Sequence, residues 1–221
     1  MTGANDAAAP ARRRDARRNR ELLIEAAHEV FTEQGLHAPI DVIARRAGIG
    51  NATLYRHFPT RAALVDAVFR DLLAGTMSTG EQARTADDAW AGLTGYLHTV
   101  FAGLAADRGT NDLMTTHLDG VDSLQAVHAH NRRTVELLLG RGRDQGTIRA
   151  DVTAEDVLFA LAALGRTVPA LTTAAGPDAW RRPLALLLDG LRATPTAPAL
   201  PEPALTAAQL NDALQGLGPR N

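Results

Sequence analysis

The sequence predicts an all-α protein in which a small N-terminal helical domain precedes a larger helical body. Helix-favouring residues, chiefly Ala, Leu, Glu and Arg, dominate the chain, whereas runs of β-branched residues are scarce. Apolar residues recur three and four positions apart, which is the spacing of one helix face, and no segment reads as a strand. The 221 residues are enough for one large domain or for a small and a medium one.

Four helices are predicted in the first third of the chain. Residues 17–34 place apolar side chains on one face and stop at Gly35, since glycine readily adopts the left-handed conformation that ends a helix. A short helix over 39–48 begins at a proline, without a side-chain cap, and ends at a glycine. A third helix covers 51–58, and a fourth, capped by a threonine, covers 60–72.

The remainder of the chain predicts a helical body after a polar linker at 75–87. The expected helices are 90–104, 112–118, 122–145, 154–174 and 179–191. The 154–174 helix opens on a near capping box and is apolar almost all round. Five of the eleven prolines follow residue 194, which predicts an extended tail with one helical turn around residues 206–214. The chain thus divides into a flexible basic arm (1–16), an N-terminal domain (17–72), a body (73–193) and a Pro-rich tail (194–221).

Composition limits the setting of the protein. The chain has no cysteine, which excludes disulfides, thiol catalysis and cysteine-bound metal and suits a reducing compartment. The N-terminus is polar and then arginine-rich, unlike a secretory signal, and no apolar stretch approaches the length expected of a membrane span. We therefore expect a soluble, cytoplasmic protein with no membrane partner.

The charge is unevenly distributed along the chain. Residues 1–61 hold ten arginines against seven acids, a balance of +3, whereas the remainder holds thirteen against eighteen, a balance of −5. Such a division predicts a basic end that meets a polyanion and an acidic body that does not.

The stretch 40–58 reads IDVIARRAGIGNATLYRHF and has the pattern of a helix-turn-helix unit. With its surroundings it closely resembles the DNA-binding signature of the TetR family of transcriptional regulators. The matching positions are Phe31, Gly35, Ile43, Ala44, Ala47, Gly48, Thr53, Leu54, Tyr55, His57 and Phe58. The resemblance covers about the first third of the chain. It implies a homodimeric repressor that binds a double-stranded operator and is released by a small-molecule effector, without cofactor, metal or catalysis.

The third helix carries the predicted contacts to bases. A helix of this size fits the major groove, and Asn51, Ala52 and Thr53 at its start can reach base edges. Tyr55 and His57 are predicted to clamp phosphates. The resemblance adds Thr53 and Arg61 to the phosphate contacts. Leu54 and Phe58 lie four positions apart, so they share one helix face and are expected in the core.

Several arginines allow two interpretations. Arg45, Arg46 and Arg56 either touch phosphate or are solvated. The arginines of the N-terminal arm and of the first turns of the helix after it either follow the DNA backbone and minor groove or form a solvated charge run. These arginines are Arg12, Arg13, Arg14, Arg17, Arg18 and Arg20.

The resemblance implies that the body binds an effector and dimerises through its last two long helices. The apolar 154–174 helix supports this independently, because it needs partners on more than one side. The expected dimer contacts are Leu158, Leu161, Trp180, Leu184, Leu187, Leu188 and Leu191, with Trp180 alternatively packed within one protomer. The expected pocket residues are Trp90, Tyr96, Phe101, Met114, His117, His128, Phe159 and Arg166, all bulky or polar groups on apolar helices. Arg166 could bind an anionic effector, pair with an acid or reach solvent, and we expect a structural pair.

The sequence disfavours two other functions, those of an enzyme and of an architectural DNA-binding protein. An enzyme would need a site such as His128 with His130, but residues two positions apart lie on different helix faces, and no phosphate loop or nucleophile elbow is present. A DNA-binding architectural protein without an effector has little use for a large acidic body.

Overall fold

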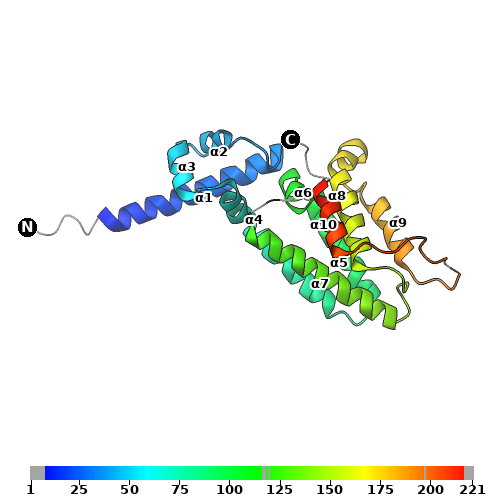
Figure 1. The fold of residues 1–221 in the computed structure, drawn as a ribbon. Helices are drawn as coiled ribbons and strands as arrows, with labels where there is room; N and C mark the ends of the chain where they lie inside the picture. Colours follow the sequence, from blue (N-terminus) through cyan, green and yellow to red (C-terminus); the bar gives the residue numbers. More distant parts are fainter. Residues whose placement is uncertain (1–7, 116–117, 119, 197, 217–221) are drawn as a thin grey trace, which may run out of the picture.

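The computed structural model describes residues 8–115, 118, 120–196 and 198–216, with side chains described from Arg13 onward. Within these residues the chain forms ten α-helices and no strand, apart from one isolated bridge between Ile148 and Arg192 (Figure 1). The helices are α1 (Ala8–Gln34), α2 (Ile40–Arg46), α3 (Asn51–His57), α4 (Arg61–Arg84), α5 (Ala89–Ala106), α6 (Arg108–Thr115), α7 (Asp122–Asp144), α8 (Ala154–Ala175), α9 (Arg181–Leu191) and α10 (Ala207–Gly216). The predicted all-α class is confirmed.

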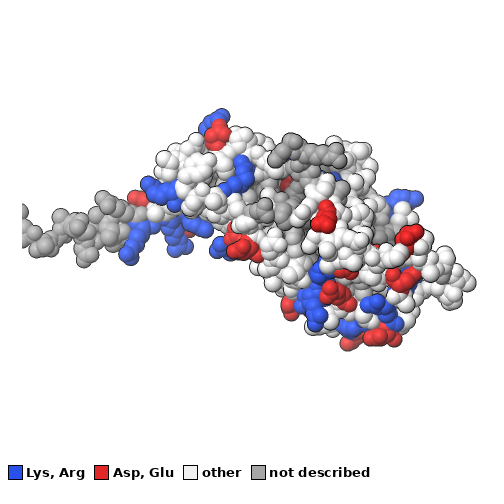
Figure 2. Space-filling model, in the orientation of Figure 1, with Lys and Arg blue, Asp and Glu red and all other residues white. Residues whose placement is uncertain are grey.

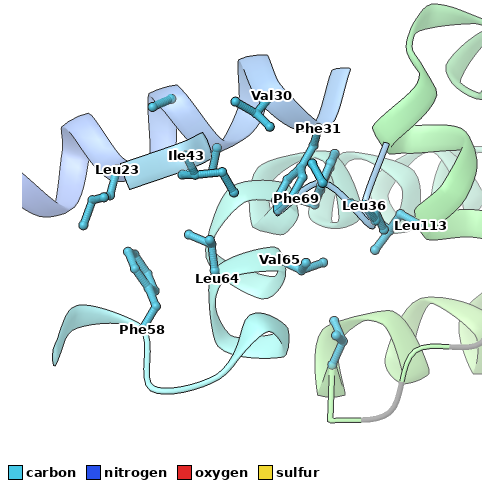
Figure 3. Close-up of a cluster of buried hydrophobic side chains, with 14 of the residues drawn as sticks. Leu23, Val30, Phe31, Leu36, Ile43, Phe58, Leu64, Val65, Phe69 and Leu113 are labelled. Atoms are coloured by element: carbon cyan, nitrogen blue, oxygen red, sulfur yellow. The ribbon is translucent and has the colours of Figure 1, made fainter. Parts of the chain in front are cut away.

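Helices α1 to α4 enclose the core of the N-terminal domain. Figure 3 shows Leu23 and Phe31 of α1 facing Ile43 of α2 and Leu64 of α4, all fully buried. Phe31 also stacks on Phe69 of α4, with ring centroids 6.2 Å apart. As predicted, α2 begins after a proline without a side-chain cap, and Thr60 caps α4 by accepting a hydrogen bond from the Ala63 N–H.

The first helix is longer than the sequence analysis predicted. It begins at Ala8 rather than Arg17, so residues 8–16 of the expected flexible arm are helical, and Figure 1 shows this part extending beyond the domain. The residues before Arg17 are mostly alanine and arginine, which favour a helix, and Pro10 lies in the first turn, where no N–H donor is needed.

The predicted linker at 75–87 is also wrong for most of its length, because α4 continues unbroken to Arg84 and packs along α7. Gly80 lies where a Cβ atom would collide with His130 and Thr134, so glycine permits the close approach of the two helices. The Arg84 guanidinium donates to the Thr134 hydroxyl at 2.8 Å and to the His130 carbonyl at 3.0 Å. These contacts outweigh the weak helix preference of the linker residues. The N-terminal domain and the body therefore share one helix.

Helices α5, α7, α8 and α9 surround the core of the body. Asp88 caps α5 by accepting hydrogen bonds from two N–H groups, and Thr153 with Asp156 forms the expected capping box on α8. Residues 198–206 form neither helix nor strand, in line with the predicted tail, and they are fixed to the body by Arg149 and Asp151. The Arg149 guanidinium donates to the Pro198 carbonyl, and the Asp151 carboxylate accepts from the Leu200 N–H.

The helical segment predicted around residues 206–214 is present near the end of the tail. It forms α10, which is longer than one turn, packs against α8 and buries the side chain of Leu210.

Helix α6 joins the two parts of the molecule. It starts at Arg108, one turn earlier than predicted, and packs against α1, α5 and α8. Gly109 lies directly against the backbone of Phe31 in α1. The Asp112 carboxylate accepts a hydrogen bond of 3.0 Å from the Leu36 N–H, in the loop after α1. The N-terminal domain thus contacts the body through α6 as well as through α4.

Helix α8 contains a proline whose missing donor is replaced by α6. Pro169 lacks the N–H that would bond the Gly165 carbonyl one turn earlier. The buried Asn111 side chain of α6 donates to that carbonyl instead, at 2.8 Å, and to the Leu104 carbonyl at 3.3 Å. A hydrogen bond between side chain and backbone therefore fixes α6 to α8.

The junction between α1 and α6 yields a paired prediction on stability. Gly35 (φ +80°) and Gly48 (φ +67°) both hold the left-handed conformation, but only at Gly35 would a Cβ atom overlap a neighbour, the Asp112 carboxylate. Gly48→Ala should lower the free energy of unfolding by about 1 kcal/mol, through backbone strain alone. Gly35→Ala should lower it by about 2 to 4 kcal/mol, because the carboxylate must also move. Urea unfolding of both variants measures the difference, and equal losses would contradict the tight α1–α6 contact.

Candidate nucleic-acid interface and ligand cavities

Helices α2 and α3 are joined by a four-residue turn that contains Gly48. Leu54 and Phe58 are buried against α1 and α4, in line with their expected place in the core. Because these two side chains anchor α3, its opposite face is turned outward. Asn51 and Ala52 at the start of that face are exposed, and Thr53 is half-buried. The structure therefore brings the predicted base-reading residues to one surface.

Tyr55 and His57 differ in their surroundings. The Tyr55 side chain is 51 % exposed, so its hydroxyl is available to a phosphate. His57 is half-buried, and its Nε2 atom has no hydrogen-bond partner among the described residues. Burial, together with the nearby charges of Arg56 and Arg20, lowers the pKa of the His57 imidazole. The imidazole therefore favours the uncharged form, and its Nε2 atom is buried rather than open to a phosphate.

The arginines of this domain fall into two groups. Arg61 donates to the Leu36 carbonyl at 2.5 Å and to the Ala38 carbonyl at 2.7 Å, so it holds the loop between α1 and α2. The phosphate contact expected of Arg61 stays a prediction, for a side chain that already bonds two protein carbonyls. Arg46 makes two 2.8 Å hydrogen bonds to the Glu33 carboxylate and ties α2 to α1.

The second group of arginines points outward. Arg45 is exposed and pairs with Asp41 one turn earlier on its own helix, whereas Arg56 on α3 is exposed without an ion pair in the described part of the chain. Arg56 is therefore the arginine of the helix-turn-helix unit with the most freedom to meet a phosphate.

The extension of α1 carries a row of arginines (Figure 2). Arg13, Arg14, Arg17 and Arg18 are exposed, and Arg17 pairs with Glu21 one turn later. Arg20 lies differently, with its guanidinium 5.2 Å from the centroid of the Phe58 ring, which tethers it to the domain. The side chain of Arg12 lies outside the described residues.

Two cavities in the described part of the body lie beside α6, and we name them by their linings. The apolar cavity, about 440 Å³, lies between α4, α5 and α6, and it includes the predicted pocket residues Tyr96 and Met114. Its lining is Leu72, Gly75, Thr76, Thr79, Tyr96, Thr99, Val100, Ala102, Gly103, Leu104, Thr110 and Met114. Burial raises the pKa of the Tyr96 phenol, whose hydroxyl donates to Asn131 at 2.6 Å.

The polar cavity, about 470 Å³, lies between the end of α5, α6 and α8. It contains one predicted pocket residue, Arg166. Its lining is Leu104, Ala105, Asp107, Arg108, Asn111, Asp112, Thr115, Arg166, Pro169, Thr172 and Thr173. Leu104 belongs to both cavities, so the two lie next to each other beside α6.

Other predicted pocket residues do not line either cavity. Phe101 is fully buried and stacks on Trp180 at 5.9 Å, so it belongs to the core. The ring of Trp90 is covered by the Arg192 guanidinium at 4.3 Å. Phe159 is 39 % exposed on the outer face of α8. His128 is half-buried on α7, outside both linings, and His117 lies outside the described residues.

The expected dimer contacts also need correction. Trp180, Leu184, Leu188 and Leu191 are buried within the protomer core, because they form the inner face of α9. Side chains already buried in one protomer cannot cover a second. Helical periodicity alone could not tell the inner from the outer face of α9 in advance.

The apolar surface that remains lies mainly on α8. Leu158 and Leu161 of α8 and Leu187 of α9 are half-buried, and Leu186 of α9, which the sequence analysis missed, is 67 % exposed. Helix α8 is long and apolar enough to cross a membrane by length and composition, a property the sequence analysis overlooked, and 17 % of its most apolar 18-residue window is buried.

Among the described residues, no three His, Asp or Glu side chains gather in an arrangement that could hold a metal ion.

Two family models match separate parts of the chain. The model of bacterial regulatory proteins of the tetR family matches residues 23–68, and the model of the C-terminal domain of SbtR-like transcriptional regulators matches residues 88–193. An HTH-type transcriptional regulator of Staphylococcus aureus (strain USA300) is 44 % identical over 53 residues, which is 24 % of this chain. The match spans 29 % of the length of that relative.

Solved structures with the same fold cover most of the chain. A TetR transcriptional regulator of Streptomyces coelicolor is 29 % identical with a TM-score of 0.52, and the match covers 79 % of this chain and 99 % of the other. SmeT, the repressor of the Stenotrophomonas maltophilia multidrug efflux pump SmeDEF, is 21 % identical with a TM-score of 0.59, covering 84 % and 97 %. Because the family models match both the helix-turn-helix domain and the body, this chain belongs to the TetR family of DNA-binding transcriptional regulators, which are not enzymes.

Proposed function

We propose that the protein is a cytoplasmic, ligand-responsive repressor that binds a pseudo-palindromic operator as a homodimer and is released by a small-molecule effector. The observation that carries the proposal is the outward face of α3. Asn51, Tyr55 and Arg56 are exposed there, while Leu54 and Phe58 fix the helix from behind.

The chemistry of that face suits a DNA duplex. Asn51 can bond an adenine edge in two places, and the methyl groups of Ala52 and Thr53 can contact a thymine methyl. The Tyr55 hydroxyl and the Arg56 guanidinium can each bond a phosphate, and the exposed arginines of α1 add attraction that does not depend on sequence.

A homodimer gives the exposed apolar surface a partner. Phe159 on α8 and Leu186 on α9 are large apolar side chains open to solvent in the single protomer. A two-fold axis beside α8 would bury the same surface from both copies. It would also hold two α3 helices at a fixed separation, as successive major grooves on one side of DNA require.

The apolar cavity gives an effector access to the DNA-binding domain. Leu72, Thr76 and Thr79 line it from α4, the helix whose first turns belong to the N-terminal domain. A ligand seated there contacts α4 directly and can favour a dimer with a different spacing of the α3 helices. A coupling of about 1 to 3 kcal/mol between effector and DNA would relieve repression. An architectural DNA-binding protein has no use for such a cavity, which favours the regulator.

The interface on α3 can be tested with a duplex that the wild-type protein selects from a random pool. Tyr55→Phe should weaken binding about tenfold, through loss of one phosphate hydrogen bond, and leave the salt dependence unchanged. Arg56→Gln should lower the slope of log affinity against log salt by about 1, because one charged phosphate contact is lost. Fluorescence anisotropy across salt measures both.

Arg133→Gln, an exposed arginine on α7, serves as the matched control and should retain the wild-type slope. If Arg56→Gln and Arg133→Gln behave alike, the charged face of α3 does not meet the DNA.

The dimer surface can be tested with a charge placed at its centre. Leu186→Glu should raise the dissociation constant of the dimer at least tenfold, because a carboxylate would be buried without a partner. The fold should be unaffected, since Leu186 is exposed in the protomer. Ala129→Glu, on an exposed position of α7, is the control. Light scattering across concentration gives the masses, and an unchanged dimer in Leu186→Glu would exclude this surface.

A further inference from the structure

Among the described residues, the two arginines that line the polar cavity have no acidic partner. Arg166 of α8 is half-buried, and its one recorded hydrogen bond goes to the Thr115 carbonyl at 3.5 Å. Arg108 lies at the start of α6. In the described part of the chain, neither guanidinium has a carboxylate within 4 Å. The structural pair expected for Arg166 is thus absent among these residues.

The two acids of the cavity are used elsewhere. Asp107 accepts hydrogen bonds from the N–H and the hydroxyl of Thr110, both at 2.7 Å, and thereby caps the start of α6. Asp112 accepts from the Leu36 N–H and so holds the loop after α1. Both carboxylates therefore have hydrogen-bond partners other than Arg166.

The neutral donors of the cavity are also committed to the protein. The hydroxyls of Thr172 and Thr173 donate to the Pro169 carbonyl, at 3.0 and 2.8 Å. The Asn111 amide donates to the Leu104 and Gly165 carbonyls. The donors left for a ligand are those of the two guanidinium groups.

From this arrangement we infer that the polar cavity is a binding site for a small organic carboxylate, held by Arg166 and Arg108. A guanidinium presents paired N–H groups that match the two oxygens of a carboxylate. Leu104, Ala105 and Pro169 supply an apolar wall for the rest of the molecule. The volume of about 470 Å³ lies within the usual range for small-molecule sites.

This site is distinct from the apolar cavity, although both adjoin α6. Thr110 and Met114, four positions apart, line the apolar cavity, whereas Asn111 and Thr115 line the polar one. These pairs lie on different faces of α6. The inference deepens the proposed function, on which it rests, by naming a ligand class and a second position from which α6 can be moved.

The experiment measures ligand binding on the full-length protein without DNA, so that it does not depend on operator recognition. Acetate, hexanoate, benzoate and phenylacetate are titrated by calorimetry, each beside its neutral amide. We expect at least one carboxylate to bind with a dissociation constant below 1 mM and its amide to bind at least tenfold more weakly. Arg166→Gln should weaken the carboxylate at least tenfold, and Arg166→Lys should weaken it less.

Two control variants locate the site. Arg133→Gln and Arg182→Gln, at exposed positions of α7 and α9 outside both cavity linings, test for general charge effects, so both should bind the carboxylate as the wild type does. Melting temperatures check that each variant is folded. The inference is overturned if no carboxylate binds at 10 mM, if the amides bind equally well, or if Arg166→Gln binds as the wild type does. Operator binding by the same samples reports separately on the proposed function.

Discussion

The position of α6 is the constraint on which the rest of the molecule depends. This eight-residue helix is too short to be stable alone, so its place is set by its neighbours. Gly109 contacts the backbone of Phe31, Asp112 bonds the Leu36 N–H, and Asn111 bonds the Gly165 carbonyl. One helix is therefore fixed to α1 on one side and to α8 on another. Any movement of α6 must change at least one of these contacts.

The fixed position of α6 makes the two cavities beside it important for contact with the N-terminal domain. Both adjoin α6, and the apolar cavity also adjoins α4, so a ligand in either contacts an element that reaches the N-terminal domain. At that end Arg61 holds the Leu36 and Ala38 carbonyls, while Leu36 is bonded to Asp112. The loop between α1 and α2 is thus attached to the body on one side and to the start of α4 on the other. A shift of α6 would be transmitted to the helix-turn-helix unit through hydrogen bonds rather than through soft packing.

The sequence predicted those features that depend on local periodicity and on short motifs. The core role of Leu54 and Phe58, the capping box at Thr153 and the division into a small domain and a body all follow from spacing of this kind. The predictions from the sequence were wrong where contacts between residues far apart in the chain determine the structure. The Thr-, Ser- and Gly-rich end of α4 is helical because Gly80 lets α7 approach, and no local signal reveals that neighbour. Similarly, Trp180 is of a residue type that is common at protein interfaces, but its ring stacks on that of Phe101, seventy-nine positions earlier in the chain.

The arginines show why composition alone gives only a coarse view of function. The first 61 residues carry a balance of +3, yet Arg46 and Arg61 are bound to the protein itself and Arg20 lies over the Phe58 ring. These three arginines stabilise the fold through these contacts. We expect their removal to alter the fold before it alters the affinity for DNA. Under the proposed function, the attraction for DNA would come from the exposed arginines of α1 and from Arg56. The same distinction applies in the body, where Arg84 and Arg141 bond protein carbonyls while Arg166 has no acidic partner among the described residues. Because an arginine cannot lose its charge at physiological pH, one that is half-buried without an acid favours binding an anion from solution.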